Sequence, residues 1–347
     1  ARAVRIGPLA APILALAFSF GLAWWTFPEG MSFWRGVAIT AAWGGSGMLV
    51  ASLLFIIREP PLAVLLGGLD TMYRWHHRSG VLAYTVLLCH PLALAMAAWS
   101  ESPGMAWQVL SPWVQHWPVR LGWLALVLLM LGLATTFAMR LPYRQWRACH
   151  YALGLAIAVA LIHVYAFVGA SGALLLLVAL AAAALGWRLL RSDLGVAAHQ
   201  YRVTHVIRPS AEMIEATLAP CAGRVAISPG QFVLAAFGEG PRYQGCDEFH
   251  PFTVSAIHAD GALSVGIKAL GPCTRRIQTL EPGVLVRLQG PFGNFLQPGA
   301  DGPQLWVAGG IGITPFLAAL RRGAVPRPTT LVYLFRTEQD AAFLEEL

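Results

Sequence analysis

Long apolar runs separated by short polar breaks occupy the chain up to about residue 190. A transmembrane helix needs roughly 20 predominantly apolar residues, and six segments are long enough. Four are separate runs, at residues 6–27, 36–57, 80–98 and 121–139. Two more share the uncharged stretch 148–187, which the glycines at 169 and 172 interrupt. The pattern therefore predicts a bundle of six membrane-spanning helices. The alternative, a soluble bundle, does not fit spans of this length and uniform apolarity.

A different pattern follows from residue 193 onward. Short runs rich in β-branched and aromatic residues alternate with Pro/Gly turns, at residues 201–207, 231–237, 262–269 and 284–289. Such closely spaced short strands predict a small β-barrel domain over residues 193–300, after a membrane domain over residues 1–192.

A third unit begins after Pro303. A strand at 304–308, a glycine turn, a helix at 315–322 and a strand at 330–335 predict the start of a doubly wound α/β domain over residues 301–347. About 44 residues follow Pro303, too few for a complete nucleotide-binding sheet. Either a tail is missing from this chain or the domain is reduced.

Arginine residues lie at alternating ends of the predicted spans. One set of ends carries Arg2, Arg5, Arg58, Arg74, Arg78, Arg140, Arg144, Arg147, Arg188 and Arg191. The opposite ends carry Arg35 and Arg120 together with Glu29 and Glu101. By the positive-inside rule the arginine-rich side is cytoplasmic. We therefore expect a multi-pass protein of the cell membrane whose N-terminus and extramembrane domains face the cytoplasm.

Composition supports a membrane protein and narrows the classes of partner. Hydrophobic residues make up 57% of the chain and charged residues 12%, too apolar for ordinary soluble domains alone. The net charge of +7 does not indicate a nucleic-acid-binding protein, because the basic residues form no stripe with interleaved aromatics. Five cysteines without a CxxC pair predict neither a disulfide framework nor a zinc site. Cys89 and Cys149 are expected to pack within helices.

Two of the predicted spans carry a pair of histidines each. Histidine in a membrane helix is costly without a partner, so each is a functional candidate. His76 (or His77) and His90 are 14 positions apart, about 40° from one shared helix face and about 21 Å apart along the axis. His150 and His163 are 13 positions apart, roughly 140° around an ideal helix. Their helix must therefore tilt, bulge or rely on side-chain reach.

Both spans run from the cytoplasmic to the outer side, so each level of the bundle receives one histidine from each span. Two levels with two imidazoles each suit two stacked haems with bis-histidine ligation. Hydrogen-bonded packing histidines or a proton relay are the alternatives, whereas ligands about 20 Å apart cannot share one zinc ion. His76 is favoured over His77 because its face is better aligned and Gly80 follows one turn later, where a porphyrin could approach.

Four motifs follow in the extramembrane region. HPFTVS (250–255) offers a polar ring, an aromatic plane and a hydroxyl, and GIKALGPCT (266–274) offers a cation and a helix start capped by Thr274. GPFG (290–293) follows, and VAGGIGITPF (307–316) lies between a strand and a helix, where glycines let the backbone approach a pyrophosphate. Each motif alone is common, but their order and context together are specific.

In this order the motifs resemble the ferric reductase and NADPH oxidase superfamily. The resemblance extends to WHHRSG with His90 and to His150 with His163, and it covers essentially the whole chain. It implies a multidomain membrane protein in which a six-helix, two-haem transmembrane bundle is fused to a ferredoxin-reductase-like dehydrogenase. That dehydrogenase would comprise an FAD-binding β-barrel and a partial α/β NAD(P)-binding domain.

The resemblance also implies roles for single residues. Phe252 would flank the FAD isoalloxazine, and Thr253 would hydrogen-bond it as the catalytic contact. His250 would take the place of an arginine of the soluble reductases, and Pro251, between His250 and Phe252, would belong to the same cofactor-binding segment. Arg336 would meet an adenosine 2′-phosphate, which favours NADPH over NADH, or it is a surface charge. The FAD diphosphate would be held by Lys268, Gly271 and Thr274. The nicotinamide nucleotide would be held by Gly309, Gly310, Gly312, Thr314 and Pro315.

The implied activity is transmembrane electron transfer from NADPH through FAD and two haems to an outer acceptor. O2 giving superoxide is expected, with Arg35 holding the anion or serving as an interfacial anchor. A ferric chelate or a periplasmic partner protein is the alternative acceptor, and a haem-bearing sensor or subunit is a non-enzymatic alternative. The family's distal segment, with a Cys-Gly-Pro-type sequence and a terminal aromatic, is not among these 347 residues. Nucleotide binding therefore depends on whether the polypeptide continues past Leu347.

Overall fold

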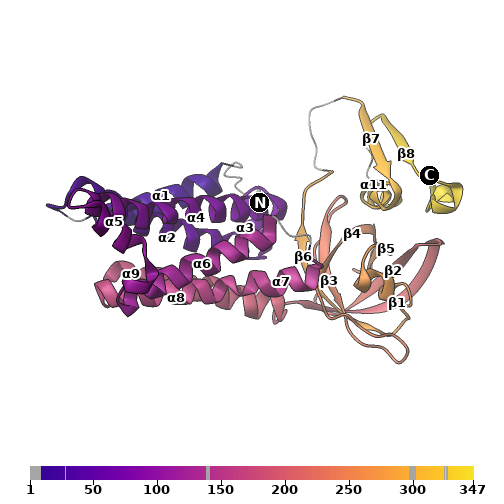
Figure 1. Ribbon diagram of the computed structural model, residues 1–347. Coiled ribbons are helices and arrows are strands. Elements are labelled where there is room, and N and C mark those ends of the chain that lie inside the picture. The colour runs from indigo at the N-terminus through magenta and orange to yellow at the C-terminus, as the bar shows by residue number, and fades with distance from the viewer. Residues whose placement is uncertain (1–8, 28, 138–140, 297–301, 324, 326) are drawn as a thin grey trace. The chain divides into compact units, whose positions relative to one another are not determined.

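The computed structural model describes residues 9–347 apart from residues 28, 138–140, 297–301, 324 and 326. Contacts divide the chain into two compact units. A helical unit takes in the described residues up to 57 and residues 70–187, whereas the second unit takes in residues 58–69 and 188–347. Figure 1 colours the helical unit from indigo to magenta and the second unit mainly from salmon to yellow.

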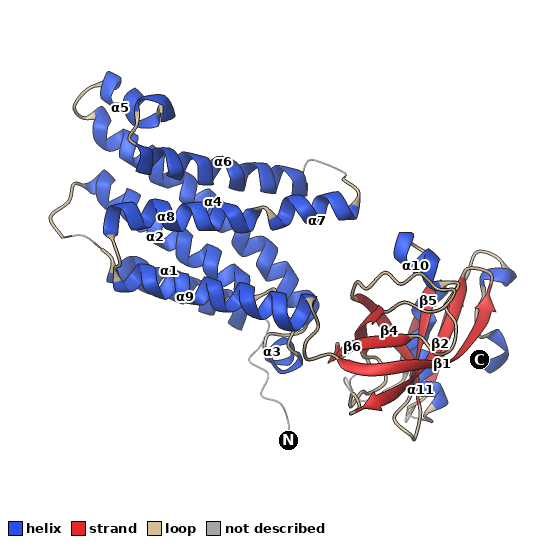
Figure 2. Cartoon of the chain, turned by 90° about the horizontal axis from the view of Figure 1, so that it is seen from below, coloured by secondary structure: helices blue, strands red, loops and turns tan. Residues whose placement is uncertain are grey.

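The helical unit consists of long helices that run alongside one another (Figures 1 and 2). Helix α1 packs on α2, and α6 packs on α8. The elements are α1 (Ala10–Trp25), α2 (Phe33–Leu54), α4 (Leu69–Trp99), α5 (Pro103–Leu110), the 3-10 turn η1 (Pro112–Val114), α6 (Trp117–Phe137), α7 (Tyr143–Tyr151), α8 (Leu153–Val168) and α9 (Gly172–Trp187).

Five stretches of the described chain are long and apolar enough to cross a membrane: Phe33–Leu54, Leu69–Trp99, Trp117–Thr136, Gln145–Val168 and Gly172–Asp193. The first predicted span appears as the shorter apolar helix Ala11–Trp25. Residues 6–8 of that span, residues 138–139 of the fourth, and Arg2, Arg5 and Arg140 lie outside the described residues. Phe20 and Trp24 are 72% and 76% exposed, a state that is unfavourable in water and natural in lipid.

Local features explain how the helices approach and bend. A Cβ atom on Gly45 of α2 would come within 2.7 Å of the Leu87 side chain on α4, so glycine permits this close contact. Helix α4 continues through Pro91, which membrane helices tolerate because neighbouring groups satisfy the freed backbone. The span with His150 and His163 is interrupted at Ala152, between α7 and α8.

Six antiparallel strands close into a barrel in the order β1-β2-β5-β4-β3-β6, which confirms the predicted β-barrel. The sequence pattern did not predict β2, because Glu215 and Pro220 interrupt its apolar run. Figure 2 draws the barrel strands in red. Their bounds are β1 (His199–Ser210), β2 (Met213–Ala222), β3 (Phe232–Phe237), β4 (His250–Ile257), β5 (Leu263–Lys268) and β6 (Leu285–Phe292), with α10 (Pro272–Ile277) between β5 and β6.

Alternating side chains from all six strands fill the barrel interior, including Tyr201, Ile214, Val254, Val265 and Leu288. The hydroxyl oxygen of Tyr201 accepts a hydrogen bond from the Val225 N–H at 2.9 Å. Burial raises the pKa of Tyr201, so the ring stays neutral as a core group.

Two short segments of the second unit precede the barrel in the chain, α3 (Pro60–Leu65) and the π-helical η2 (Arg188–Asp193). The guanidinium of Arg191 lies 2.8 Å from Glu59, and Gln289 of β6 donates to the Ser192 carbonyl at 2.7 Å. These bonds attach both segments to the barrel.

The last segment forms a β-α-β unit. Strands β7 (Gln304–Gly309) and β8 (Thr329–Leu334) pair in parallel and are connected through η3 (Gly310–Ile313) and α11 (Thr314–Arg321). Trp306 stacks on Phe316 at 4.8 Å within a core that includes Met213 of the barrel. The 3-10 turns η4 (Glu338–Asp340) and η5 (Leu344–Glu346) follow.

The cysteines differ from the prediction. Cys246 and Cys273 form a disulfide with a Cα–Cα distance of 5.8 Å, so the expectation of no disulfide is wrong at this pair. Nothing local in the sequence marks it, because 27 residues separate the two cysteines. Cys89 and Cys149 lie on α4 and α7 as predicted, but their side chains are exposed rather than packed.

Candidate functional site

Two of the four candidate histidines meet at one end of the helical unit. The ring centroids of His76 on α4 and His150 on α7 lie 5.9 Å apart. The Nδ1 atom of His76 lies 3.0 Å from the Ser52 carbonyl oxygen, and His150 stacks on Trp146 at 5.1 Å. The side chain of His77 is exposed.

The second pair has the same kind of support. The Nδ1 atom of His90 on α4 lies 2.9 Å from the Ala38 carbonyl oxygen, and that of His163 on α8 lies 2.7 Å from the Pro118 carbonyl oxygen. A Cβ atom on Gly122 of α6 would lie 2.7 Å from Cε1 of His163, so glycine makes room for this ring.

These bonds determine which imidazole nitrogen can bind a metal. A carbonyl oxygen only accepts, so Nδ1 of His76, His90 and His163 donates its proton and Nε2 carries the lone pair. Metal-ligating histidines commonly have this arrangement. Two metal–nitrogen bonds of about 2 Å, plus about 1 Å from each nitrogen to its ring centre, separate opposed rings by roughly 6 Å. The spacing of His76 and His150 matches that value.

Space beside the first pair also suits a flat prosthetic group. Gly80 and Gly154 each follow a histidine by four residues, and a Cβ atom on either would meet nothing within 4 Å. Residues four apart on one helix share a face, so open space adjoins His76 on α4. The break at Ala152 lies between His150 and His163, so the ideal-helix angle does not apply. The spacing of the first pair and the space beside His76 therefore fit a haem.

The HPFT segment begins strand β4. Phe252 is only 6% exposed and belongs to the barrel core, where its ring lies 6.0 Å from Phe237. A flavin would meet only a small edge of this ring, so the expected flanking role of Phe252 stays a prediction that its burial does not favour. Thr253 is half-buried and Pro251 is exposed. Nε2 of His250 lies 3.8 Å from a Glu248 carboxylate oxygen.

The predicted diphosphate residues lie at the end of β5 and the start of α10. The ammonium group of Lys268 is 3.7 Å from the Glu212 carboxylate. Oγ1 of Thr274 accepts hydrogen bonds from the N–H groups of Leu270 at 2.9 Å and Gly271 at 2.8 Å. The N-cap of α10 is Gly271, so the prediction of Thr274 as the helix cap is wrong. Thr274 is the third helical residue and reaches back to this turn, so the two backbone donors are engaged within the protein.

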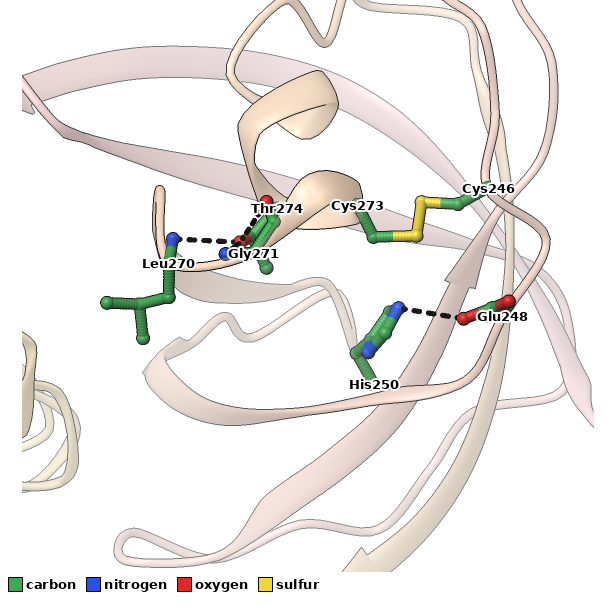
Figure 3. The surroundings of a disulfide bond; sticks show 7 residues. All are labelled: Cys246, Glu248, His250, Leu270, Gly271, Cys273 and Thr274. Atoms are coloured by element: carbon green, nitrogen blue, oxygen red, sulfur yellow. Dashed lines mark hydrogen bonds and ion pairs between the residues drawn. A yellow bond between two sulfur atoms is a disulfide. The ribbon is translucent and has the colours of Figure 1, made fainter. Parts of the chain in front are cut away.

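A cysteine and histidine cluster joins the two flavin segments, and sequence reasoning missed it. Ligand atoms of Cys246, His250 and Cys273 all lie within 4.8 Å of one another. Figure 3 shows the disulfide beside the His250 ring and next to the Thr274 turn. The signal was present, since Cys273 lies inside the GPCT motif and Cys246 four residues before HPFT.

The GGIGITP segment forms the turn between β7 and α11. Gly310 has a φ of +49°, which a side chain would strain, and a Cβ atom on Gly309, Gly310 or Gly312 would meet nothing within 4 Å. Thr314 is buried and donates to the Ile311 carbonyl at 2.9 Å, with Pro315 next in the helix. The open glycine backbone at a helix start suits a close approach by phosphate, and the nucleotide-binding role of these residues stays a prediction.

The two remaining predicted residues are both exposed arginines. Arg336 follows β8. Arg35 lies in the first turn of α2, one turn before Ala38, whose carbonyl holds His90. Arg35 is therefore on the helix that supports the second histidine pair.

An ion pair between a partly accessible arginine and a buried glutamate attaches α11 to the barrel, and sequence patterns did not reveal it. Arg321 lies 2.6 Å from Glu215 and 2.7 Å from Glu346, and Ser255 also donates to Glu215. Burial is the largest single influence and lowers the pKa of Arg321. The hydrogen bonds and charges of Glu346 and Glu215 together outweigh it and raise that pKa above its ordinary value. A Cβ atom on Gly266 would lie 2.7 Å from Thr314, so β5 also contacts this helix closely.

Residues 41–161 match the family described as ferric reductase like transmembrane component. The range includes His76, His90 and His150. Together with the five apolar helices, this match confirms the prediction of a multi-pass membrane protein.

Curated relatives match parts of the chain. Dual oxidase 2 of Rattus norvegicus is 35% identical over 94 residues, which are 22% of this chain and 6% of the relative. A probable dihydroorotate dehydrogenase B (NAD(+)) electron transfer subunit of Pyrococcus horikoshii is 34% identical over 118 residues, 34% of this chain and 42% of the relative. The chain thus spans less than half the length of these relatives.

Solved structures resemble the chain over less than half its length. Full-length CYP116B46 from Tepidiphilus thermophilus has 26% identity and a TM-score of 0.36, covering 43% of this chain and 20% of that chain. Phthalate dioxygenase reductase has 18% identity and a TM-score of 0.39, covering 44% and 49%. Likeness at these scores does not by itself define a common fold.

Proposed function

We propose that this chain carries electrons across a cell membrane. Its resemblance to the ferric reductase and NADPH oxidase superfamily is confirmed by its transmembrane domain and its dual oxidase relatives. The donor is cytosolic NADPH (or NADH), the carriers are FAD and two b-type haems, and the acceptor is on the outer face. The proposed acceptor is O2, which is reduced to superoxide. Six spans, with the extramembrane domains in the cytoplasm, belong to the same proposal.

The histidine geometry carries this proposal. Three imidazoles donate from Nδ1 to backbone carbonyls, so Nε2 carries the lone pair that would bind iron, and His76 faces His150 across 5.9 Å. The haem ligands are His76 with His150 and His90 with His163. A hydrogen-bonded core histidine or a proton relay does not require the facing rings seen for His76 and His150.

The barrel and the glycine turn supply the donor side. His250 and Thr253 would hold the flavin, and Gly310 and Gly312 the nucleotide. FAD is suited to this junction because it accepts a two-electron hydride and releases single electrons, as haem iron requires. The relative named an electron transfer subunit supports this role.

The alternative acceptors leave the electron path unchanged. His90 and His163 would both hold the outer haem, so an acceptor would be reduced without binding its iron, and a ferric chelate or a periplasmic partner protein would also fit. A haem-bearing sensor or subunit is the non-enzymatic alternative. The exposed Arg35, on the helix that supports His90, favours a small anionic product such as superoxide.

Absorption spectra of the purified full-length polypeptide test the proposal. Under anaerobic conditions, NADPH should produce reduced low-spin haem bands, and air should remove them with formation of superoxide that superoxide dismutase destroys. Reduction by dithionite but not by NADPH would overturn the nucleotide half of the proposal. Reoxidation by a ferric chelate but not by air would replace O2 as the acceptor, and a lack of any haem would overturn the ligand assignment.

A further inference from the structure

The Cys246–Cys273 disulfide connects two segments that the proposed function gives to one cofactor. Cys246 lies in the loop between β3 and β4, four residues before the HPFT strand, and Cys273 lies in the first turn of α10. These segments would contact the isoalloxazine side and the diphosphate side of FAD. Figure 3 shows the bridge running between them.

Both sides of the bridge are held in place by other bonds. Asp247, next to Cys246, pairs with Arg287 of the barrel at 2.5 Å. The side-chain amide of Gln278, after α10, donates to the Ile267 carbonyl of β5 at 3.1 Å. The backbone carbonyl of Gln278 accepts a hydrogen bond from Arg208 at 2.9 Å. The two sulfur atoms therefore remain neighbours when the bridge opens, and opening does not release either segment from the barrel.

The pair is also accessible to reagents. Both cysteines are half-buried rather than sealed in the core. In the proposed orientation this domain faces the cytoplasm, where thiols are kept reduced and disulfides are mostly transient, catalytic or redox-sensing. A bridge at this position is therefore unlike a structural disulfide of a secreted protein.

We propose that Cys246 and Cys273 form a reversible redox modification site whose reagents are small disulfides and dithiols, and that its oxidation weakens FAD binding. In the reaction, two cysteine thiols lose two electrons and two protons. A small disulfide takes them up, its S–S bond breaks, and two small thiols leave as the Cys246–Cys273 bond forms through a mixed disulfide. The effect on FAD rests on the proposed function.

The direction of the effect follows from the contacts. In the bridged form both sulfur atoms lie within 4.8 Å of a His250 ring nitrogen, so the bridge fills the space between the start of β4 and α10. The N–H groups of Leu270 and Gly271 are engaged by Thr274 in the same form. Reduction removes the S–S bond, so the two thiols stay near each other but no longer fix the Thr274 turn relative to the start of β4.

The test uses the full-length membrane protein equilibrated with glutathione over a range of reducing to oxidising mixtures. Free thiols are then alkylated and located by mass spectrometry, and FAD binding is measured on the same samples. We expect a reversible transition at Cys246 and Cys273 and FAD binding that is roughly tenfold weaker in the oxidised form. Cys246→Ser and Cys273→Ser should abolish the redox response, whereas Cys221→Ser, at an exposed cysteine outside any disulfide, should keep it.

Several results would overturn the inference. A pair that stays bridged in every mixture is a structural crosslink, and one that never oxidises is no switch. A reduced protein that retains one equivalent of zinc through Cys246, His250 and Cys273 has a metal site instead. Equal FAD binding in both states overturns this inference alone, whereas no FAD binding in either state overturns it together with the proposed function.

Discussion

The imidazole rings of His76 and His150 face each other at an angle of 78° with centroids 5.9 Å apart, although they belong to different helices. His77, the neighbouring residue on α4, is exposed. The sequence left open which of these two adjacent histidines would bind a haem. In the structure, the ring of His76 lies close to a histidine of another helix.

His76→Ala and His77→Ala form a matched pair for that question. We expect His76→Ala to lower the haem content from two per chain to about one, because the first pair loses an axial ligand. His77→Ala should keep both haems. The haem-to-protein ratio measures this, and equal loss in the two variants would contradict the assignment of His76.

Gly80→Leu should remove the same haem for a different reason. A Cβ atom at Gly80 would meet nothing within 4 Å outside its own helix, so a leucine side chain there would extend into the space proposed for the porphyrin. Gly186→Leu is the control, because position 186 is equally open but lies on α9. A Gly80→Leu protein with two haems and an unchanged spectrum would show that the space is not a haem site.

Gly122→Ala should affect the other haem. The new methyl group would lie 2.7 Å from Cε1 and 2.9 Å from Nδ1 of His163, so the ring must leave its bond to the Pro118 carbonyl. Overpacking of this kind costs about 1–3 kcal/mol. Electron paramagnetic resonance should show one low-spin haem signal shifted or lost, with the other unchanged. Gly44→Ala, where the nearest atom is 3.9 Å away, should leave both signals intact.

Arg321→Gln should loosen α11 from the barrel. The change leaves the buried Glu215 carboxylate, which is 5% exposed, without its cation, and breaking a buried pair in this way costs about 3–5 kcal/mol. Hydrogen exchange of the peptide covering α11 should accelerate roughly a hundredfold or more relative to wild type. Arg322→Gln, at the exposed neighbouring position, should leave exchange unchanged.

The same cluster should depend on pH. The hydrogen bond from Arg321 lowers the pKa of Glu346, so Glu346 is charged and stabilising above the ordinary glutamate pKa. This contribution disappears as the pH falls through the lowered pKa. The difference in corrected α11 exchange between wild type and Arg321→Gln should therefore shrink in acid. A difference that grows in acid would contradict this role of Glu346.

Local patterns predicted the features that depend on local sequence. Apolar length identified the spans, and Pro/Gly punctuation identified most strands, because burial and turn geometry act on neighbouring residues. Two elements departed from the pattern: β2 carries a buried glutamate, and the first span is described only as a 16-residue helix.

The site could be predicted only in part for the same reason. The candidate histidines were identifiable because an imidazole in an apolar span is unusual. The carbonyls that orient them, Ser52, Ala38 and Pro118, carry no side-chain signal, since any residue provides a carbonyl. Cys246 with Cys273, and Arg321 with Glu215, meet only after the chain folds.

Helix α2 carries no histidine, yet it holds both candidate haem ligands of α4, His76 and His90. The Ser52 carbonyl bonds His76, and the Ala38 carbonyl bonds His90. Ser52 and Ala38 are fourteen residues apart on α2, and His76 and His90 are also fourteen residues apart on α4. The two antiparallel helices therefore keep the same register at both histidines, so the spacing of the two α2 carbonyls matches the spacing of the two α4 imidazoles. One residue inserted between 38 and 52 would turn one carbonyl by about 100° relative to the other. The two imidazoles could then no longer both be aligned.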